Sequence, residues 1–272
     1  MIIAVSGLTE DAQGNKGSAG AGKDEVADHL VRKHGFVKIA FADEIKRIAM
    51  RLWDFSEEQL WGPSEERNKP DKRYPFQCRG CQTCEFRCDH YIGFLTPRHA
   101  LQQIGTEVAR AIDPDVWVRF ALNVADQILN GPSKEDARFV SSAGKLERRP
   151  MTWCARYDRT KGVTGGWGEG QPAKGVVISD LRFKNEKAGV GAVGGKNWRK
   201  MRKVATLPGH GGKHASETGL LDVPDAEFDG IFPDGDLNHC FMLIDSVMDV
   251  YSGRILPYDP AQADVPPFLR KK

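Results

Sequence analysis

The chain has 272 residues, a length that allows one enlarged α/β domain or two small ones. With 40% hydrophobic and 28% charged residues, its composition is that of a globular protein and excludes a disordered or collagen-like chain. Thirty-nine basic and thirty-seven acidic side chains leave a net charge of +2, too small for a surface that binds nucleic acid or anionic lipid over its whole extent. Any polyanionic ligand must therefore be bound locally.

The N-terminus, MIIAVSG, lacks the basic start and the long apolar stretch of a signal peptide, and no apolar run of the chain is long enough to cross a membrane. We therefore expect a cytoplasmic protein that does not act at a membrane. In such a reducing compartment, closely spaced cysteines indicate metal binding rather than disulfides.

The first part of the chain predicts an α/β fold with a parallel sheet. Residues 2–5 form an apolar run typical of a strand buried on both faces, and a helix begins near Asp24, with Gly35 as its C-terminal cap. A second strand over 36–41 and a helix capped by Asp43 continue the alternation. The later predicted elements are helices from Thr96-Pro97 and from Asp115 to Asn130, strands at 176–178, 204–207 and 228–232, and a helix from Asp236.

The loop between the first strand and the first helix fits GxxxxGK, the Walker A spacing of a P-loop, in which backbone N–H groups and a lysine hold phosphate oxygens. Aspartate replaces the usual Ser or Thr, and it could either reach Mg²⁺ or satisfy the helix dipole. Residues 8–16 lengthen this loop, as a solvated excursion or as a base-contacting segment. The predicted ATP-binding residues are Gly17, Ser18, Ala19, Gly20, Ala21, Gly22, Lys23 and Asp24.

A carboxylate, Asp180, ends the predicted strand 176–178, where a Walker B-like acid would face a Mg²⁺–phosphate centre, and Arg182 follows within reach of phosphate oxygens. Asn185 and Glu186 could instead stabilise the next helix start. The basic run from Lys196 to Lys203 suits either a lid over phosphates or a solvated face.

Several segments resemble bacteriophage deoxynucleoside monophosphate kinases, a family of P-loop nucleoside monophosphate kinases. They are GKDEVADHL (22–30), HGFVKIAFADEIK (34–46), TPRHALQQIGTEVARAIDPDVWV (96–118), VVISDLRFKNE (176–186), HASETGL (214–220) and FDGIFPDGDL (228–237). The resemblance implies one P-loop kinase domain over 1–272, with insertions at about 8–16, 69–92 and 140–173. The last insertion is predicted to be hairpin-like or mobile.

By this resemblance, the chain transfers the γ-phosphoryl group of ATP, with Mg²⁺, to a deoxynucleoside 5′-monophosphate, giving the diphosphate and ADP for phage DNA synthesis in the host cytoplasm, and it could be a homodimer. The implied catalytic residues are Lys23, Asp180 and Arg182. The helix after Thr96 carries polar residues that can share a face, with Arg98 or Arg110 expected at the acceptor phosphate and a glutamine at the base. The implied acceptor-site residues are Phe41, Asp43, Lys46, Arg98, Gln102, Gln103, Thr106, Arg110, Trp117 and Glu217.

Four cysteines lie within eleven residues, the number of thiolates in a tetrahedral structural Zn²⁺ site. His90 is an alternative ligand, and an iron–sulfur cluster or free or redox-active thiols remain open. A zinc site would stabilise an insertion that has few apolar residues. The predicted metal ligands are Cys78, Cys81, Cys84 and Cys88.

Two other functions fit parts of this pattern. A P-loop protein with a zinc module could phosphorylate DNA, RNA or a modified base, although the nearly balanced charges around the cysteines argue against nucleic acid as a partner. A kinase of another small metabolite, such as dephospho-coenzyme A, would share the loop but not the later segments.

Overall fold

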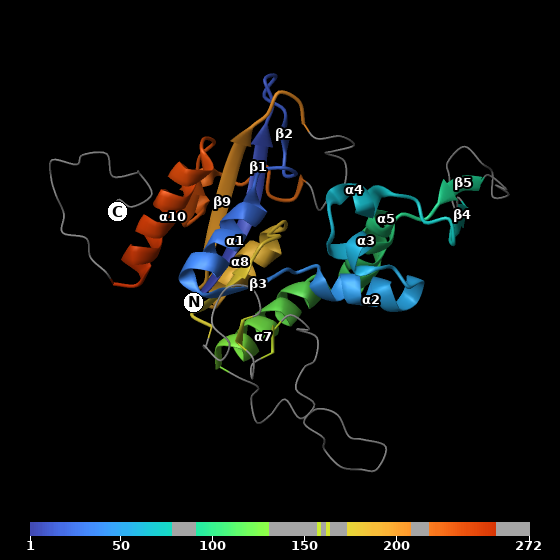
Figure 1. Ribbon diagram of the computed structural model, residues 1–272, viewed down its shortest axis with the longest axis horizontal. Helices are drawn as coiled ribbons and strands as arrows, with labels where there is room; N and C mark the ends of the chain where they lie inside the picture. Colours follow the sequence, from blue (N-terminus) through green and yellow to red (C-terminus); the bar gives the residue numbers. More distant parts are fainter. Residues whose placement is uncertain (78–90, 131–156, 159–161, 164–172, 208–217, 254–272) are drawn as a thin grey trace, which may run out of the picture. The chain divides into compact units, whose positions relative to one another are not determined.

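The computed structural model describes residues 1–77, 91–130, 157–158, 162–163, 173–207 and 218–253 (Figure 1). The chain forms two compact units, one made of residues 1–41 and 117–272 and the other of residues 42–116. Among the described residues, no helix is both long enough and apolar enough to cross a membrane.

The first unit is built on a parallel sheet with the strand order β10-β9-β1-β8-β3 (Figure 1). The short strand β2 runs antiparallel to the end of β1, pairing Glu10 with Lys16. Because β1 is central and its neighbours follow it through crossovers, the expected parallel α/β sheet is confirmed. The strands are β1 (Ile2–Glu10), β2 (Lys16–Gly17), β3 (Phe36–Ile39), β8 (Gly175–Ile178), β9 (Lys196–Lys203) and β10 (Gly230–Phe232).

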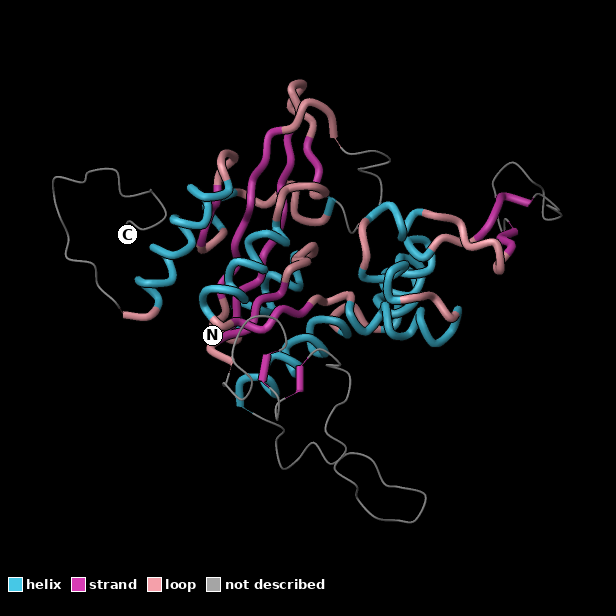
Figure 2. Tube along the Cα trace, in the orientation of Figure 1, coloured by secondary structure: helices cyan, strands magenta, loops and turns pink. Residues whose placement is uncertain are grey.

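Helices cover both faces of this sheet, because successive side chains of a strand point to opposite sides. Ile3 and Val5 of β1 join a core cluster with α1 and α10, whereas Ala4 joins a cluster with α7 and α8. Figure 2 shows these helices beside the strands. Their bounds are α1 (Lys23–His34), α7 (Val116–Asn130), α8 (Lys184–Ala192) and α10 (Leu237–Tyr251), with a 3-10 turn η2 (Asp225–Glu227) and an antiparallel pair β6 (Tyr157–Asp158) and β7 (Gly162–Val163).

The predicted helix signals of this unit are confirmed at two ends. Gly35 adopts a left-handed conformation (φ 74°) after α1, and its N–H donates to the Leu30 carbonyl. The carboxylate of Asp236 accepts from the His239 N–H at the start of α10.

Two predictions of strand extent were wrong. Strand β1 continues through Leu8 to Glu10, because β9 pairs with β1 as far as Glu10. The excursion predicted at residues 8–16 is therefore largely the end of β1 and a short hairpin with β2. The run Lys196–Lys203 is the strand β9 rather than a lid, and residues 204–207 are not a strand. Long Lys and Arg side chains obscured this strand, because their charged ends can reach acceptors while their stems lie in the core.

The second unit packs short helices around a small core of Ala49, Phe55, Leu60, Leu95 and Ala100. The strands that flank residues 78–90 pair with each other, Pro75 opposite Phe94. Its elements are α2 (Asp43–Trp53), α3 (Glu57–Trp61), α4 (Ser64–Asn68), β4 (Pro75–Gln77), β5 (Tyr91–Phe94), α5 (Pro97–Gln102), the π-helix η1 (Gln103–Val108) and α6 (Ala109–Ile112).

The predicted cap Thr96 is confirmed, since its hydroxyl accepts from the His99 N–H with Pro97 in the first turn. Asp43, in contrast, is the first residue of α2 and not its cap; its carboxylate accepts from the Trp61 indole. The regular helix expected after Thr96 is interrupted by η1. Because a π turn contains more residues than an α turn, the apolar stripe rotates, and Val108 is 56% exposed.

Candidate functional site

The glycine-rich loop lies at the carboxyl end of β1 and leads into the N-terminus of α1. A Cβ atom on Gly7 of β1 would lie 2.8 Å from both the Ala21 Cβ and the Ser18 carbonyl oxygen. Gly20 and Gly22 have φ angles of 74° and 83°, which glycine adopts without steric cost. The loop is therefore packed directly on the strand, beside the N–H groups at the start of α1 that lack intrahelical acceptors.

Strand β9 supports the same loop from the side. Arg202 donates from Nη1 to the Gly20 carbonyl at 3.0 Å. The Lys200 Cε lies 4.0 Å from where a Cβ of Gly22 would be, and its ammonium donates to the carbonyls of Met201 and Pro233. Two basic residues of the run 196–203 thus contact or approach the loop from a buried strand.

Three predicted catalytic residues meet at this edge of the sheet. Burial is the largest cause of a lowered pKa at the Lys23 ammonium; Asp24 and Asp180 act to raise that pKa, and Arg182 acts to lower it. Asp180 and Arg182, which belong to the segment between β8 and α8, are therefore near enough to Lys23 to influence its charge. An ammonium with a reduced water shell gains more from a phosphate ligand than an exposed one.

Asp180 is held by the backbone of the segment that follows β3. Its carboxylate accepts from the Phe41 N–H at 2.7 Å, and only 8% of Asp180 is exposed. The next residues begin α8, where one Glu186 oxygen accepts from the N–H groups of Arg182 and Phe183 at 2.7 and 3.0 Å. Glu186 therefore stabilises the helix start, as the sequence allowed.

Asp24, at the position of the usual hydroxyl residue, pairs with two lysines. Its carboxylate lies 3.3 Å from the Lys23 Nζ and 3.1 Å from the Lys38 Nζ, and Lys38 also pairs with Asp28 at 3.0 Å. Although burial acts to raise it, the two ammonium groups hold the pKa of Asp24 below its usual value. Asp24 is thus an ionised oxygen donor beside the loop.

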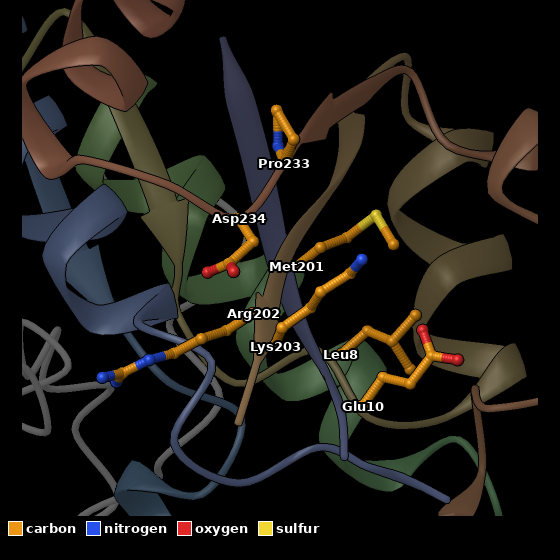
Figure 3. A pocket seen from close by; sticks show the side chains of 7 residues that line it. All are labelled: Leu8, Glu10, Met201, Arg202, Lys203, Pro233 and Asp234. Carbon is orange, nitrogen blue, oxygen red and sulfur yellow. The ribbon is translucent and has the colours of Figure 1, made fainter. Parts of the chain in front are cut away.

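A pocket of about 370 Å³ opens beside the same strand ends (Figure 3). Apolar, acidic and basic side chains share its lining, and Arg202 links it to the loop through Gly20. The lining residues are Leu8, Glu10, Met201, Arg202, Lys203, Pro233 and Asp234.

The acceptor-site candidates fall in both units. Phe41 and Trp117 belong to the first unit, where both side chains are buried, 3% and 5% exposed. In the second unit, the Lys46 Nζ lies 3.8 Å from the Asp43 Oδ1 and 5.3 Å from the centroid of the Trp61 ring.

The polar residues after Thr96 have varied surroundings. Arg98 donates to the Asn68 side chain, and Arg110 donates to the Pro114 carbonyl at 3.2 Å. Gln103 is exposed, and Gln102 and Thr106 are half-buried. A Cβ on Gly105 would lie 2.7 Å from the Ile45 Cδ1, so the close approach expected at this glycine is made by the side chain of α2.

Glu217 and the four cysteines Cys78, Cys81, Cys84 and Cys88 lie outside the described residues, so they remain sequence predictions.

Sequence reasoning did not assign Gly7, Lys38 or Trp61 to a site. Gly7 closely follows the apolar run of residues 2–5, which was a usable signal for a close approach of the backbone. Lys38 and Trp61 depend on tertiary contacts, as does the contact of Arg202, in the basic run 196–203, with the loop.

The first unit is a three-layer α/β fold, in which helices cover both faces of a mostly parallel sheet. The glycine-rich loop lies at the edge formed by the carboxyl ends of the strands. No family model matches the chain. It is similar to a protein of Acanthamoeba polyphaga mimivirus described as "Putative deoxynucleotide monophosphate kinase", with 28% identity over 182 residues, covering 67% of this chain and 69% of the relative.

Proposed function

We propose that this chain is an ATP-dependent kinase that converts deoxynucleoside 5′-monophosphates to diphosphates. The observation that carries the proposal is a glycine-rich loop packed on β1 at the carboxyl edge of the sheet, with Lys23 at the start of α1 and Asp180 and Arg182 near enough to influence its charge. The description of the mimivirus relative as a putative deoxynucleotide monophosphate kinase agrees with this activity. In open α/β sheets, this edge is where ligands bind.

In the proposed reaction, the loop and Lys23 hold the donor phosphates of ATP. Backbone N–H groups and one ammonium suit this task, since phosphoryl transfer needs positioning and charge neutralisation more than covalent chemistry. Arg182 would contact the transferred group, because a guanidinium can fork onto phosphate oxygens.

The carboxylates of Asp180 and Asp24 are hard oxygen donors at this edge, and they fit Mg²⁺. When bound, Mg²⁺ neutralises charge on the phosphate oxygens. The hydrogen bond from the Phe41 N–H already holds the Asp180 carboxylate in position.

The pocket lined by Leu8, Met201 and Pro233 is proposed to take the base of the donor nucleotide, since it adjoins the loop and combines apolar walls with polar groups. For the acceptor nucleotide we propose the second unit's cluster of Asp43 and Lys46, to which the structure adds the ring of Trp61. The remaining proposed acceptor residues are Phe41, Arg98, Gln102, Gln103, Thr106, Arg110, Trp117 and Glu217.

We further propose, from the sequence, a structural zinc ion at the four cysteines, a single kinase domain with insertions, and a role in phage DNA synthesis.

The test incubates the purified full chain with ATP, Mg²⁺ and each natural or modified deoxynucleoside monophosphate, and separates the products by chromatography. We expect at least one diphosphate. A product only from dephospho-coenzyme A, or only from a polynucleotide, would replace the proposal by one of those activities, and no product from any acceptor would refute it.

Two lysine variants test the assignment of the loop. Lys23→Met should lower kcat/KM about 10²-fold or more, because one charged phosphate donor is lost. Lys16→Met is the matched control: Lys16 is exposed in β2, seven residues earlier in the chain, and its loss should leave activity unchanged. Equal activity of Lys23→Met and wild type would refute the role of the loop.

A further inference from the structure

Two histidines and an aspartate gather at the end of α1 that lies away from the glycine-rich loop. His29 and His34 of α1 place their Nε2 atoms 2.8 and 2.7 Å from the same carboxylate oxygen, Oδ1 of Asp245 in α10. One ligand atom from each residue lies within 4.8 Å of the others. A helix rises about 1.5 Å per residue, so His29 and His34 lie about 9 and 16 Å along α1 from Lys23.

We propose that His29, His34 and Asp245 bind a divalent transition-metal ion such as Zn²⁺, at a site separate from the nucleotide site. Two imidazoles and a carboxylate are a ligand set that Zn²⁺ takes in proteins, with a fourth position for water. The proposal does not depend on the proposed kinase activity.

The distances are close to those of a coordinated ion. Bonds of about 2.0–2.1 Å in a tetrahedron place neighbouring ligand atoms about 3.3 Å apart. The two nitrogen–oxygen distances of 2.7 and 2.8 Å therefore need to open by only about half an ångström.

The surroundings hold the ligands in place. The ring of Phe241 stacks on His29 at 4.2 Å between centroids and 3° between planes, which fixes the imidazole plane. Lys33 binds the other oxygen of Asp245, Oδ2, at 2.7 Å, so Oδ1 is left to the two histidines. Such a second contact orients a carboxylate ligand.

The site is enclosed but accessible. The side chains of His29, His34 and Asp245 are 11%, 14% and 23% exposed, which keeps a bound ion from full hydration while leaving a route for its entry. The nearby positive charge of Lys33 opposes the binding of a cation, but its pairing with Asp245 offsets part of that charge. A bound ion would join the end of α1 to α10 and so stabilise the first unit.

The test measures metal content and uses three variants of the full chain. After removal of metal with a chelator and equilibrium dialysis against Zn²⁺, His34→Gln and Asp245→Asn should each bind one ion per chain fewer than wild type. His239→Gln, at an exposed histidine of the same helix α10, is the matched control and should bind as wild type does. Equal metal content in all four proteins would overturn the proposal.

Two further measurements, of which the second uses only the wild-type protein, separate this site from the predicted cysteine site. Co²⁺ bound by imidazole and carboxylate absorbs in the visible region without the near-ultraviolet thiolate band, so the difference spectrum between wild type and His34→Gln should lack that band. In the wild-type protein, ¹⁵N NMR should show the Nε2 signals of two histidines shifting on addition of Zn²⁺. Unshifted imidazole signals would mean that the three residues form a hydrogen-bond network only.

Discussion

Replacing Gly7 by alanine tests whether the glycine-rich loop depends on its direct packing against β1. The added Cβ would lie 2.8 Å from the Ala21 Cβ and from the Ser18 carbonyl oxygen, whereas ordinary contacts begin near 3.4 Å. Neither neighbour is the flexible end of a long side chain, so the loop itself must move by roughly 0.6 Å. Overpacking of this kind costs about 1–3 kcal/mol of the free energy of unfolding.

The same movement should impair the use of ATP. A displacement of about 1 Å in a positioned group can cost about 10²-fold in rate, so we expect kcat/KM for ATP to fall at least tenfold. Urea unfolding, followed by tryptophan fluorescence, gives the change in stability, and a steady-state assay of ADP formation gives the kinetic change.

Gly191→Ala is the matched control for this prediction. Gly191 lies in α8, and the nearest atom to its added Cβ would be the Asn197 Nδ2 at 3.8 Å, an ordinary contact. Because alanine favours a helix, this variant should gain up to about 1 kcal/mol of stability. The packing argument is refuted if Gly7→Ala has the same free energy of unfolding and the same kcat/KM for ATP as wild type. It is also refuted if both variants change the free energy of unfolding in the same direction.

Two further predictions concern residues that hold each unit together. Arg199→Lys should lower the free energy of unfolding by about 2 kcal/mol. Arg199 donates to the buried carbonyls of Val223 and Leu220 at 2.8 and 2.7 Å, and one ammonium cannot reach both. Urea unfolding measures this change, and an unchanged midpoint would contradict it. In the second unit, hydrogen bonds from Arg73 hold the pKa of Asp71 well below its usual value, so Asp71 stabilises the fold above about pH 4 and loses this effect as pH falls further. Asp71→Asn should therefore flatten the acid side of the stability–pH curve, and a curve parallel to that of wild type would rule this out.

The sequence by itself determined the α/β class and most elements of the first unit. Uninterrupted apolar runs at residues 2–5 and 176–178 predicted buried parallel strands, and the signals at Gly35, Thr96 and Asp236 placed helix ends correctly. These features depend on local backbone conformation and on burial of both faces of a strand, which neighbouring residues encode.

Tertiary structure decided where charged segments lie. Lys196–Lys203 has the composition of a solvated face, but it forms a strand whose residues Asn197 to Lys200 are buried. Carbonyls of distant segments accept from the Arg199 guanidinium and from the Lys200 ammonium. The π-helix η1 and the hydrogen bond from the Trp61 indole to the Asp43 carboxylate likewise depend on packing within the second unit. A local pattern cannot contain these contacts.

For the candidate site, the sequence identified the loop and the carboxylate after β8 as separate motifs. Only the fold brings Lys23 close to Asp180 and Arg182, about 157 positions later in the chain, because crossovers in a parallel sheet return the carboxyl ends of distant strands to one edge. The same folding joins His29 to Asp245 across two helices, a pairing that no spacing in the sequence reveals.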